Sequence, residues 1–136
     1  MRGEGKMNIK IDAVGLFVND MNTMVSFYRD VMGMKTDWNG EANTEFNTEG
    51  TRLIMYGRKD FEKMTSHKYD YPKGFNGTME LAFDFPKFED VDIEYKRLVD
   101  AGAESVLEPT DEPWGQRTCY VADPEGNLIE ISSFGR

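Results

Sequence analysis

The chain has only one cysteine, Cys119, and one histidine, His67, among its 136 residues. A single cysteine excludes an internal disulfide and a zinc site built from several cysteines, and a single histidine excludes a site that needs two. No apolar stretch is longer than a few residues, so none has the length of a membrane-spanning helix. The sequence also lacks a glycine-rich phosphate loop and a serine–histidine–aspartate set.

Basic residues are scarce as well. There are 16 Lys and Arg against 25 Asp and Glu, and the formal net charge is −9. This charge repels phosphate backbones and anionic lipid headgroups, so we expect no nucleic-acid partner and no membrane partner. Residues 1–6 are polar and lack the apolar region of a signal peptide, so we expect a mobile tail over residues 1–7 and a cytoplasmic protein.

Large apolar side chains are plentiful, with 9 Phe, 6 Tyr, 2 Trp and 9 Met, as in a globular domain. Hydrophobic periodicity and turn signals predict two successive modules, each with the order strand–helix–strand–strand–strand. Module 1 spans about residues 8–57 and module 2 about 77–134, joined by a connector over 58–76. We therefore predict a single α+β domain over residues 1–136, in which two βαβββ modules form a curved mixed sheet around a cleft.

Periodicity and turn residues also predict where the elements lie. The expected strands are 9–18, 34–38, 43–48, 51–57, 77–85, 103–107, 117–122 and 127–133, and the expected helices are 19–33 and 88–101.

Equivalent positions of the two modules predict the lining of the cleft. Superposing the modules pairs Ala13 with Glu80 and Ile54 with Glu130. Along 77–85, alternate residues are apolar and are expected to pack against the helix. Glu80 belongs to the other row, and therefore points to the open face of the sheet. Phe17 lies on the same open face of the first strand. A cleft between repeats is a common ligand site.

Two pairs of sequence segments carry a family resemblance. They are VGLFVND at 14–20 with FYRDVMG at 27–33, and EPWGQR at 112–117 with VADPEGNLIEI at 121–131. The pattern resembles the vicinal oxygen chelate superfamily, which includes glyoxalase I, bleomycin-resistance proteins, fosfomycin-resistance proteins and extradiol dioxygenases. The resemblance covers nearly all of the chain and implies the paired-module fold. It also implies a homodimer, with a cleft in each protomer or shared between two.

The resemblance further implies a metal ligand at the positions of Ala13, Ile54, Glu80 and Glu130. Only Glu130 has the expected residue type, since the resemblance implies histidine at the first and third positions. His67 lies in the connector, away from these strands. We therefore expect no histidine-based metal centre and no cofactor. A divalent metal such as Mg²⁺, Mn²⁺, Ni²⁺ or Zn²⁺, if one binds, would be held by Glu80 and Glu130.

Glu80 and Glu130 are accordingly the candidate catalytic residues, and three uses are open. Repulsion and burial could raise the pKa of one carboxyl and make it a general acid or base. Arg117 or water could instead neutralise the pair. In the third use the carboxylates recognise a cationic or amine-bearing ligand, while Phe17 and Trp114 stack on its flat parts. Phe17, Trp114 and Arg117 are the candidate ligand-binding residues.

The leading hypothesis is a glyoxalase/bleomycin-resistance-like protein that binds a small organic ligand without a histidine-based metal centre. It would act by sequestering the ligand or by acid–base chemistry. The alternative is a metal-dependent enzyme, a lyase or isomerase similar to glyoxalase I (lactoylglutathione lyase), with a carboxylate-rich site. An extradiol dioxygenase is disfavoured, because its iron requires two histidines and a carboxylate. Enzyme and binding protein both remain open at this point.

Overall fold

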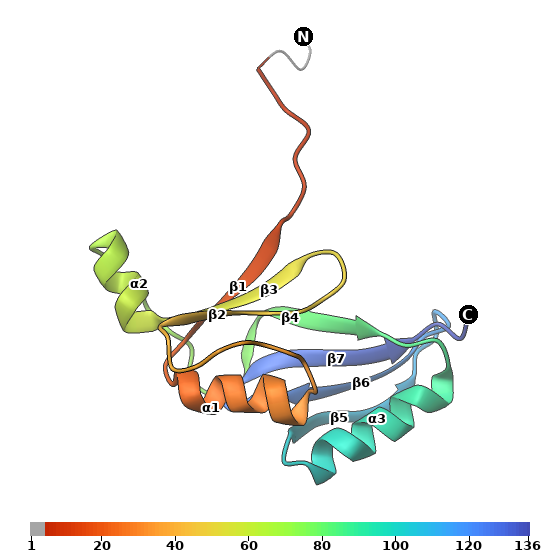
Figure 1. Cartoon of the computed structure of the whole chain (residues 1–136). Coiled ribbons are helices and arrows are strands. Elements are labelled where there is room, and N and C mark those ends of the chain that lie inside the picture. The colour runs from red at the N-terminus through yellow and green to blue at the C-terminus, as the bar shows by residue number, and fades with distance from the viewer. Residues whose placement is uncertain (1–4) are drawn as a thin grey trace.

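The computed structural model describes residues 5–136 and folds them into two β-sheets, with α1 (Met21–Ser26) and α3 (Phe88–Asp100) against one side (Figure 1). The first four residues of the tail predicted over 1–7 lie outside this range. The elements are β1 (Ala13–Val18), α1 (Met21–Ser26), the π-helical turn η1 (Phe27–Val31), β2 (Asn43–Phe46), β3 (Arg52–Gly57), α2 (Arg58–Thr65), β4 (Asn76–Asp84), α3 (Phe88–Asp100), β5 (Glu104–Asp111), β6 (Arg117–Ala122) and β7 (Asn127–Ser133). The predicted α+β class is confirmed.

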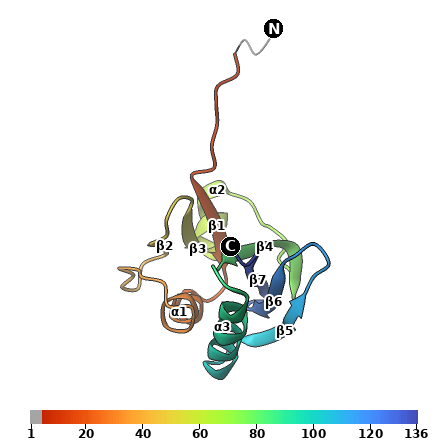
Figure 2. The same cartoon turned by 90° about the vertical axis from the view of Figure 1, so that its right-hand side faces the viewer.

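Each module contributes one sheet. The strand order is β1-β3-β2 in module 1 and β4-β7-β6-β5 in module 2. In both sheets the first strand of the module pairs in parallel with the last, and the other pairs are antiparallel. In the end-on view the sheets arch over α1 and α3, which lie side by side (Figure 2). The strand orders make β1 and β4 edge strands of their sheets.

The core fills the space between the sheets and these two helices. Alternation along β7 buries Ile129 and Ile131 against α3, which contributes Val91 and Leu98. In module 1 the fully buried Tyr28 ring packs near Phe46 of β2, with 5.9 Å between ring centroids. The largest fully buried side chains are Tyr28, Phe46, Met24, Met55, Leu98, Ile129 and Ile131. Burying these rows removes them from water and is the main stabilising contribution of the fold.

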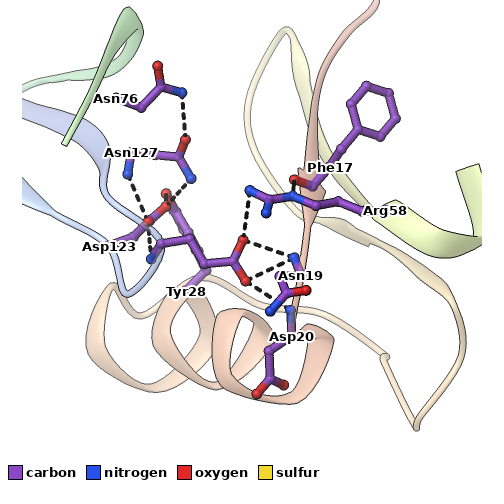
Figure 3. A network of polar contacts seen from close by, with 9 residues as sticks. Phe17, Asn19, Asp20, Tyr28, Arg58, Asn76, Asp123 and Asn127 are labelled. Carbon is purple, nitrogen blue, oxygen red and sulfur yellow. Dashed lines mark hydrogen bonds and ion pairs between the residues drawn. The ribbon is translucent and has the colours of Figure 1, made fainter. Parts of the chain in front are cut away.

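The turn between β6 and β7 carries a buried carboxylate, Asp123, which is 3% exposed (Figure 3). The buried hydroxyl of Tyr28 donates to its Oδ2 at 2.8 Å, and Asn127 donates a backbone and a side-chain N–H at 3.0 and 2.9 Å. The backbone N–H of Glu125 donates to Oδ1 at 2.9 Å. Burial and the charge of Asp123 raise the pKa of Tyr28, so its hydroxyl stays a donor.

The same turn binds module 1 through Glu125. Its carboxylate accepts the backbone N–H groups of Asn19 and Asp20, at 2.9–3.0 Å and 2.9 Å. Arg58 lies 3.3 Å from this carboxylate and donates from Nε to the carbonyl of Phe17 at 3.0 Å (Figure 3). One turn of module 2 therefore holds the end of β1, the start of α1 and the start of α2.

Gly126 completes this turn in the left-handed region, with φ +88°. A Cβ at this position would overlap the carbonyl of Gly74, the residue that leads into β4. The backbone carbonyl of Gly126 also accepts the N–H of Asn76 at 2.7 Å. Glycine is required here both by φ and by the close approach of the second chain segment.

The structure corrects the prediction of a strand over 34–38. The backbone N–H of Asn47 donates to the carbonyl of Lys35 at 2.9 Å, but the following contact joins the side chains of Thr36 and Thr44. The N–H of Trp38 bonds to the hydroxyl of Thr36 instead of to a strand. This segment therefore has no ladder, and the sheet of module 1 has three strands.

The two helical segments of module 1 also differ from expectation. The predicted helix over 19–33 is a short α-helix continued by η1, where the N–H of Met32 donates to the carbonyl of Phe27, five residues earlier. This wider turn lets two consecutive side chains, Phe27 and Tyr28, face the core.

The connector contains α2, a helix that was not predicted from the sequence. It buries no residue, and its cap, Gly57, provides no side-chain hydrogen bond, so the usual sequence signals of a helix are absent.

A search for membrane-crossing helices finds none long and apolar enough among residues 5–136.

We predict that Asp123→Ala lowers the free energy of unfolding by about 2–4 kcal/mol, because it leaves the buried Tyr28 hydroxyl and two backbone N–H groups without an acceptor. Urea unfolding followed by circular dichroism measures the loss. Asp111→Ala is the matched control, since this carboxylate is 77% exposed and pairs with Arg117 at the surface, and we expect it to cost less than about 1 kcal/mol. Equal losses in the two variants would contradict the role assigned to the turn.

Candidate functional site

The face of the module 2 sheet opposite α3 brings Glu80 and Glu130 together. Glu80 lies on β4 and Glu130 on the neighbouring strand β7. In the sheet, Glu130 pairs with Ala82 of β4 on one side and with Tyr120 of β6 on the other. The hydroxyl of Tyr120 donates to Oε1 of Glu80 at 2.7 Å. Because the strands are adjacent and both residues point to the same face, the charge of Glu80 acts on the pKa of Glu130.

Glu130 is the more enclosed member of the pair, with 9% of its surface exposed. The hydroxyl of Thr118 donates to its Oε2 at 2.8 Å, and the side-chain amide of Gln116 approaches the same oxygen at 3.4 Å. Burial raises the pKa of Glu130, and the charge and hydrogen bonding of Glu80 raise it further, against the opposing hydrogen bond from Thr118. Glu130 therefore retains a proton to higher pH than an ordinary glutamate.

Glu80 is exposed, so solvent reaches the pair from its side. The Tyr120 hydroxyl donates to Glu80, and burial together with this hydrogen bond raises the pKa of the hydroxyl. The site thus presents one enclosed and one solvent-exposed carboxyl group, with neutral donors around them. An arrangement of this kind can accept a donor group of a ligand or exchange a proton with it.

Trp114 reaches this pair indirectly. Its indole N–H donates to Oε1 of Gln116 at 2.8 Å, and Gln116 in turn approaches Glu130. The indole is 64% exposed, so its ring stands at the margin of the carboxyl pair with most of its surface open to solvent.

Arg117 lies on the opposite face of β6. It donates to both carboxylate oxygens of Asp92 on α3, at 2.8 and 2.7 Å, and to Asp111 at 2.8 Å. Thr118, the next residue, points to Glu130, so alternation carries Arg117 away from the carboxyl pair. Arg117 therefore does not neutralise Glu80 and Glu130, and the structure does not place it with them.

Phe17 belongs to a separate aromatic cluster in module 1. Its ring stacks on that of Phe61 from α2, with 3.9 Å between centroids and 25° between planes. Phe61 stacks on Tyr69 in turn, at 5.4 Å and 29°. His67 is exposed and lies beside Tyr69, with ring centroids 6.3 Å apart.

The comparisons with known proteins agree on one family. A sequence profile described as "Glyoxalase/Bleomycin resistance protein/Dioxygenase superfamily" matches residues 10–131, about nine tenths of the chain. This chain belongs to that superfamily. The resemblance inferred from the sequence is therefore confirmed.

Individual relatives are distant. The chain is 29% identical to "Uncharacterized protein YraH" of Bacillus subtilis (strain 168) over 127 residues, which cover 90% of this chain and 97% of that protein. Its fold is similar to a glyoxalase/bleomycin resistance protein/dioxygenase from Nocardioides, with a TM-score of 0.80, 23% identity, and coverage of 93% and 84% of the two chains. It is also similar to a lactoylglutathione lyase from Agrobacterium tumefaciens, with a TM-score of 0.74, 18% identity, and coverage of 93% and 95%. At these identities the structural likenesses show the fold alone.

Superfamily members often bind divalent metals, so the donor set of this chain can be compared with such a centre. Ala13 and Ile54, on β1 and β3, have aliphatic side chains that cannot bind a metal ion. Glu80 and Glu130 already accept hydroxyl hydrogen bonds. Within residues 5–136 no three histidine, cysteine, aspartate or glutamate side chains are grouped as a metal site requires. These residues do not fit the histidine-based centre of the superfamily.

The sequence analysis missed Tyr120, Thr118 and Gln116, the partners of the carboxyl pair. A signal was present, because Thr118 and Tyr120 alternate with the buried row of β6 and pair with the strand that carries Glu130. Cys119 lies in that buried row and is fully enclosed. Burial, with the charge of Asp92, raises the pKa of its thiol to about 12, so this superfamily member has no reactive thiolate there.

We predict that Glu130→Gln changes how stability depends on pH. The raised pKa of Glu130 means that its ionisation opposes folding, so wild type loses stability as pH rises from the ordinary value of 4.5 through the raised value. Glutamine resembles the protonated acid and does not ionise. The stability of the variant relative to wild type should therefore rise over this interval, by about 1.4 kcal/mol per unit of pKa shift, and then level off.

Urea unfolding at intervals between pH 4 and pH 8 measures this difference. Glu104→Gln is the matched control, because Glu104 is exposed on β5, and its difference from wild type should stay flat. A flat difference for Glu130→Gln as well would show that the carboxyl pair does not hold an extra proton.

Proposed function

We propose that this chain binds a small organic ligand at the Glu80–Glu130 pair and uses no histidine-based metal centre. The observation that carries the proposal is the hydrogen-bond network in which Tyr120 and Thr118 donate to these carboxyl groups. Superfamily members bind small ligands. Here the positions that correspond to metal ligands hold two hydrogen-bonded acids and two aliphatic side chains.

The chemistry of the pair favours a ligand that donates hydrogen bonds. Glu80 is accessible to solvent, and no arginine or lysine bonds to either carboxyl group among the ion pairs of residues 5–136. An amine-bearing ligand would supply the missing positive charge. Trp114 extends the surface to one side, and its exposed ring offers a flat apolar contact to such a ligand.

The metal-dependent lyase or isomerase is the second candidate. The convergence of two carboxyl groups favours it, since Mg²⁺ and Mn²⁺ take oxygen ligands. Two carboxylates would leave most of the coordination to water. A metal would also compete with the hydroxyl donors of Tyr120 and Thr118. For these reasons we favour ligand binding by the acids themselves.

The test combines metal titration with ligand binding. We expect Mg²⁺, Mn²⁺, Ni²⁺ and Zn²⁺ to bind more weakly than about 1 mM by calorimetry, and small primary amines to bind better than carboxylic acids of the same skeleton by ligand-observed NMR. Glu80→Gln/Glu130→Gln should abolish amine binding, whereas Glu104→Gln/Glu108→Gln, which changes two exposed carboxylates on β5, should not. Stoichiometric micromolar binding of a metal that disappears in Glu80→Gln/Glu130→Gln would replace this proposal with the metal-dependent one.

We also propose a homodimer in the cytoplasm. Support for the dimer comes from a hollow of about 1040 Å³ between the edge strands β1 and β4, whose lining includes Val14, Leu53, Leu81 and Phe83. Residues 5–12 extend away from the body beside this hollow, with Ile11 72% exposed (Figures 1 and 2). Free edges and exposed apolar side chains of this kind are often covered by a second chain.

If the dimer covers Ile11, a charge at this position should separate the two chains. Sedimentation at micromolar concentration should give twice the mass of one chain for wild type, and Ile11→Glu should give one chain. Ile93→Glu, at a 65% exposed position on α3, should leave the dimer intact. A wild-type protein that sediments as a single chain would contradict the proposal.

A further inference from the structure

The chain contains two asparagine–glycine pairs, Asn39-Gly40 and Asn76-Gly77. In such a pair the backbone nitrogen of the glycine can attack the side-chain amide of the asparagine, because glycine has no Cβ to hinder the approach. The attack also requires the backbone to rotate at the asparagine. It therefore depends on how firmly the fold holds each pair, and the two pairs are held very differently.

Asn76 is fixed at the start of β4, where it pairs with Asn127 of β7 (Figure 3). Its backbone N–H donates to the carbonyl of Gly126 at 2.7 Å. Its side-chain oxygen accepts the N–H of Thr78 at 3.0 Å, and its side-chain nitrogen donates to Asn127 at 3.3 Å. Both ends of the side-chain amide are thus bonded, and the backbone cannot rotate unless these bonds break.

Asn39 lies in the loop between η1 and β2, outside the ladders of both sheets. Asn39 and Gly40 are both exposed. Within residues 5–136, neither the side chain of Asn39 nor the N–H of Gly40 makes a hydrogen bond. Gly40 has φ +95°, and no atom lies within 4 Å of the position that a Cβ would take there. The attacking nitrogen and the amide are therefore open to water and free to approach each other.

Two hydrogen bonds close this loop around Gly40. The backbone N–H of Asn39 donates to Oε1 of Glu41 at 2.7 Å, and the indole N–H of Trp38 donates to the carbonyl of Glu41 at 2.7 Å. The bond from Asn39 lowers the pKa of Glu41, so this carboxylate is charged at neutral pH. A second negative charge on residue 39 would face it across one residue, and the two charges would repel each other.

We propose that Asn39 is a site of spontaneous deamidation in the folded protein and that the fold protects Asn76. The backbone nitrogen of Gly40 bonds to Cγ of Asn39, its proton passes to the side-chain nitrogen, and ammonia leaves. A five-membered cyclic imide remains, and water opens it at either carbonyl. Opening at Cγ gives aspartate, and opening at the main-chain carbonyl gives isoaspartate. The reaction consumes one water, releases one ammonia and involves no change of oxidation state.

This site goes beyond the function proposed above, because it lies in the loop before β2 and uses neither Glu80 nor Glu130. Each event makes the formal net charge of −9 more negative by one unit. In the isoaspartate product the main chain runs through the side chain, so the path from residue 39 to Glu41 gains one carbon. Both products place a carboxylate beside Glu41, and isoaspartate also lengthens the loop that Glu41 closes.

Incubation of the folded full chain in H₂¹⁸O at mildly alkaline pH tests the proposal. Ion-exchange chromatography should resolve a more acidic species, and peptide mass spectrometry should find ¹⁸O at residue 39. We expect Asn39 to react at least about tenfold faster than Asn76, because Asn76 must first break its hydrogen bonds. A protein isoaspartyl methyltransferase should methylate the product. In guanidinium chloride, where both pairs are released, the two rates should become similar.

Two variants locate the reaction. Asn39→Gln keeps an amide at the exposed position, but its attack would require a six-membered ring, so the acidic species should not form at residue 39. Asn76→Gln makes the same change at the other asparagine–glycine pair and is the matched control. It should leave the rate at Asn39 as it is in wild type.

Three results would overturn the proposal. The first is a folded chain that stays unmodified at residue 39 while the chain in guanidinium chloride reacts there. The second is equal rates at Asn39 and Asn76 in the folded chain. The third is an acidic species that forms as fast in Asn39→Gln as in wild type.

Discussion

The turn between β6 and β7 is the constraint on which the rest of the molecule depends. Asp123 closes the turn and anchors Tyr28 in the core, while Glu125 binds the backbone where β1 ends and α1 begins. Two modules with separate sheets thereby become one body, although the two sheets share no ladder. The position of α2, and with it the ring of Phe61 beside Phe17, follows from the contact between Arg58 and the same carboxylate.

The two outer sheet faces differ in chemistry at equivalent positions of the two ladders. Module 2 has Glu80 and Glu130 where module 1 has Ala13 and Ile54. The hydroxyl groups of Thr118 and Tyr120 donate hydrogen bonds to the acidic pair, and burial of Glu130 raises its pKa. In module 1 the ring of Phe17 stacks on that of Phe61. One duplicated scaffold therefore presents a polar surface and an aromatic surface.

Much of this arrangement could be predicted from local patterns. Alternation and turn residues located β6 and β7 and placed Glu80 on the open face, because the period of a strand is a local property. Superposing the two modules, together with the family resemblance, placed Glu130 in the same cleft. The strand expected over 34–38 was wrong, since forming a ladder depends on a partner strand and not on the segment alone. Arg117 was expected to bind the ligand because of the family resemblance. Its neighbour Thr118 points to Glu130, so Arg117 points to the other face of the sheet, where it bonds to Asp92 of α3. The stacking of Phe61 on Phe17 joins residues far apart in the chain, and no spacing rule indicates it.

The burial of Cys119 has a practical consequence for chemistry on this protein. Burial raises the pKa of the thiol to about 12, so it stays protonated at neutral pH, and the side chain is fully enclosed between the sheet and α3. The folded chain is therefore silent toward maleimides and disulfide reagents. A cysteine introduced at any exposed position would be the single addressable thiol, so dyes and spin labels can be attached one at a time without first removing a native residue.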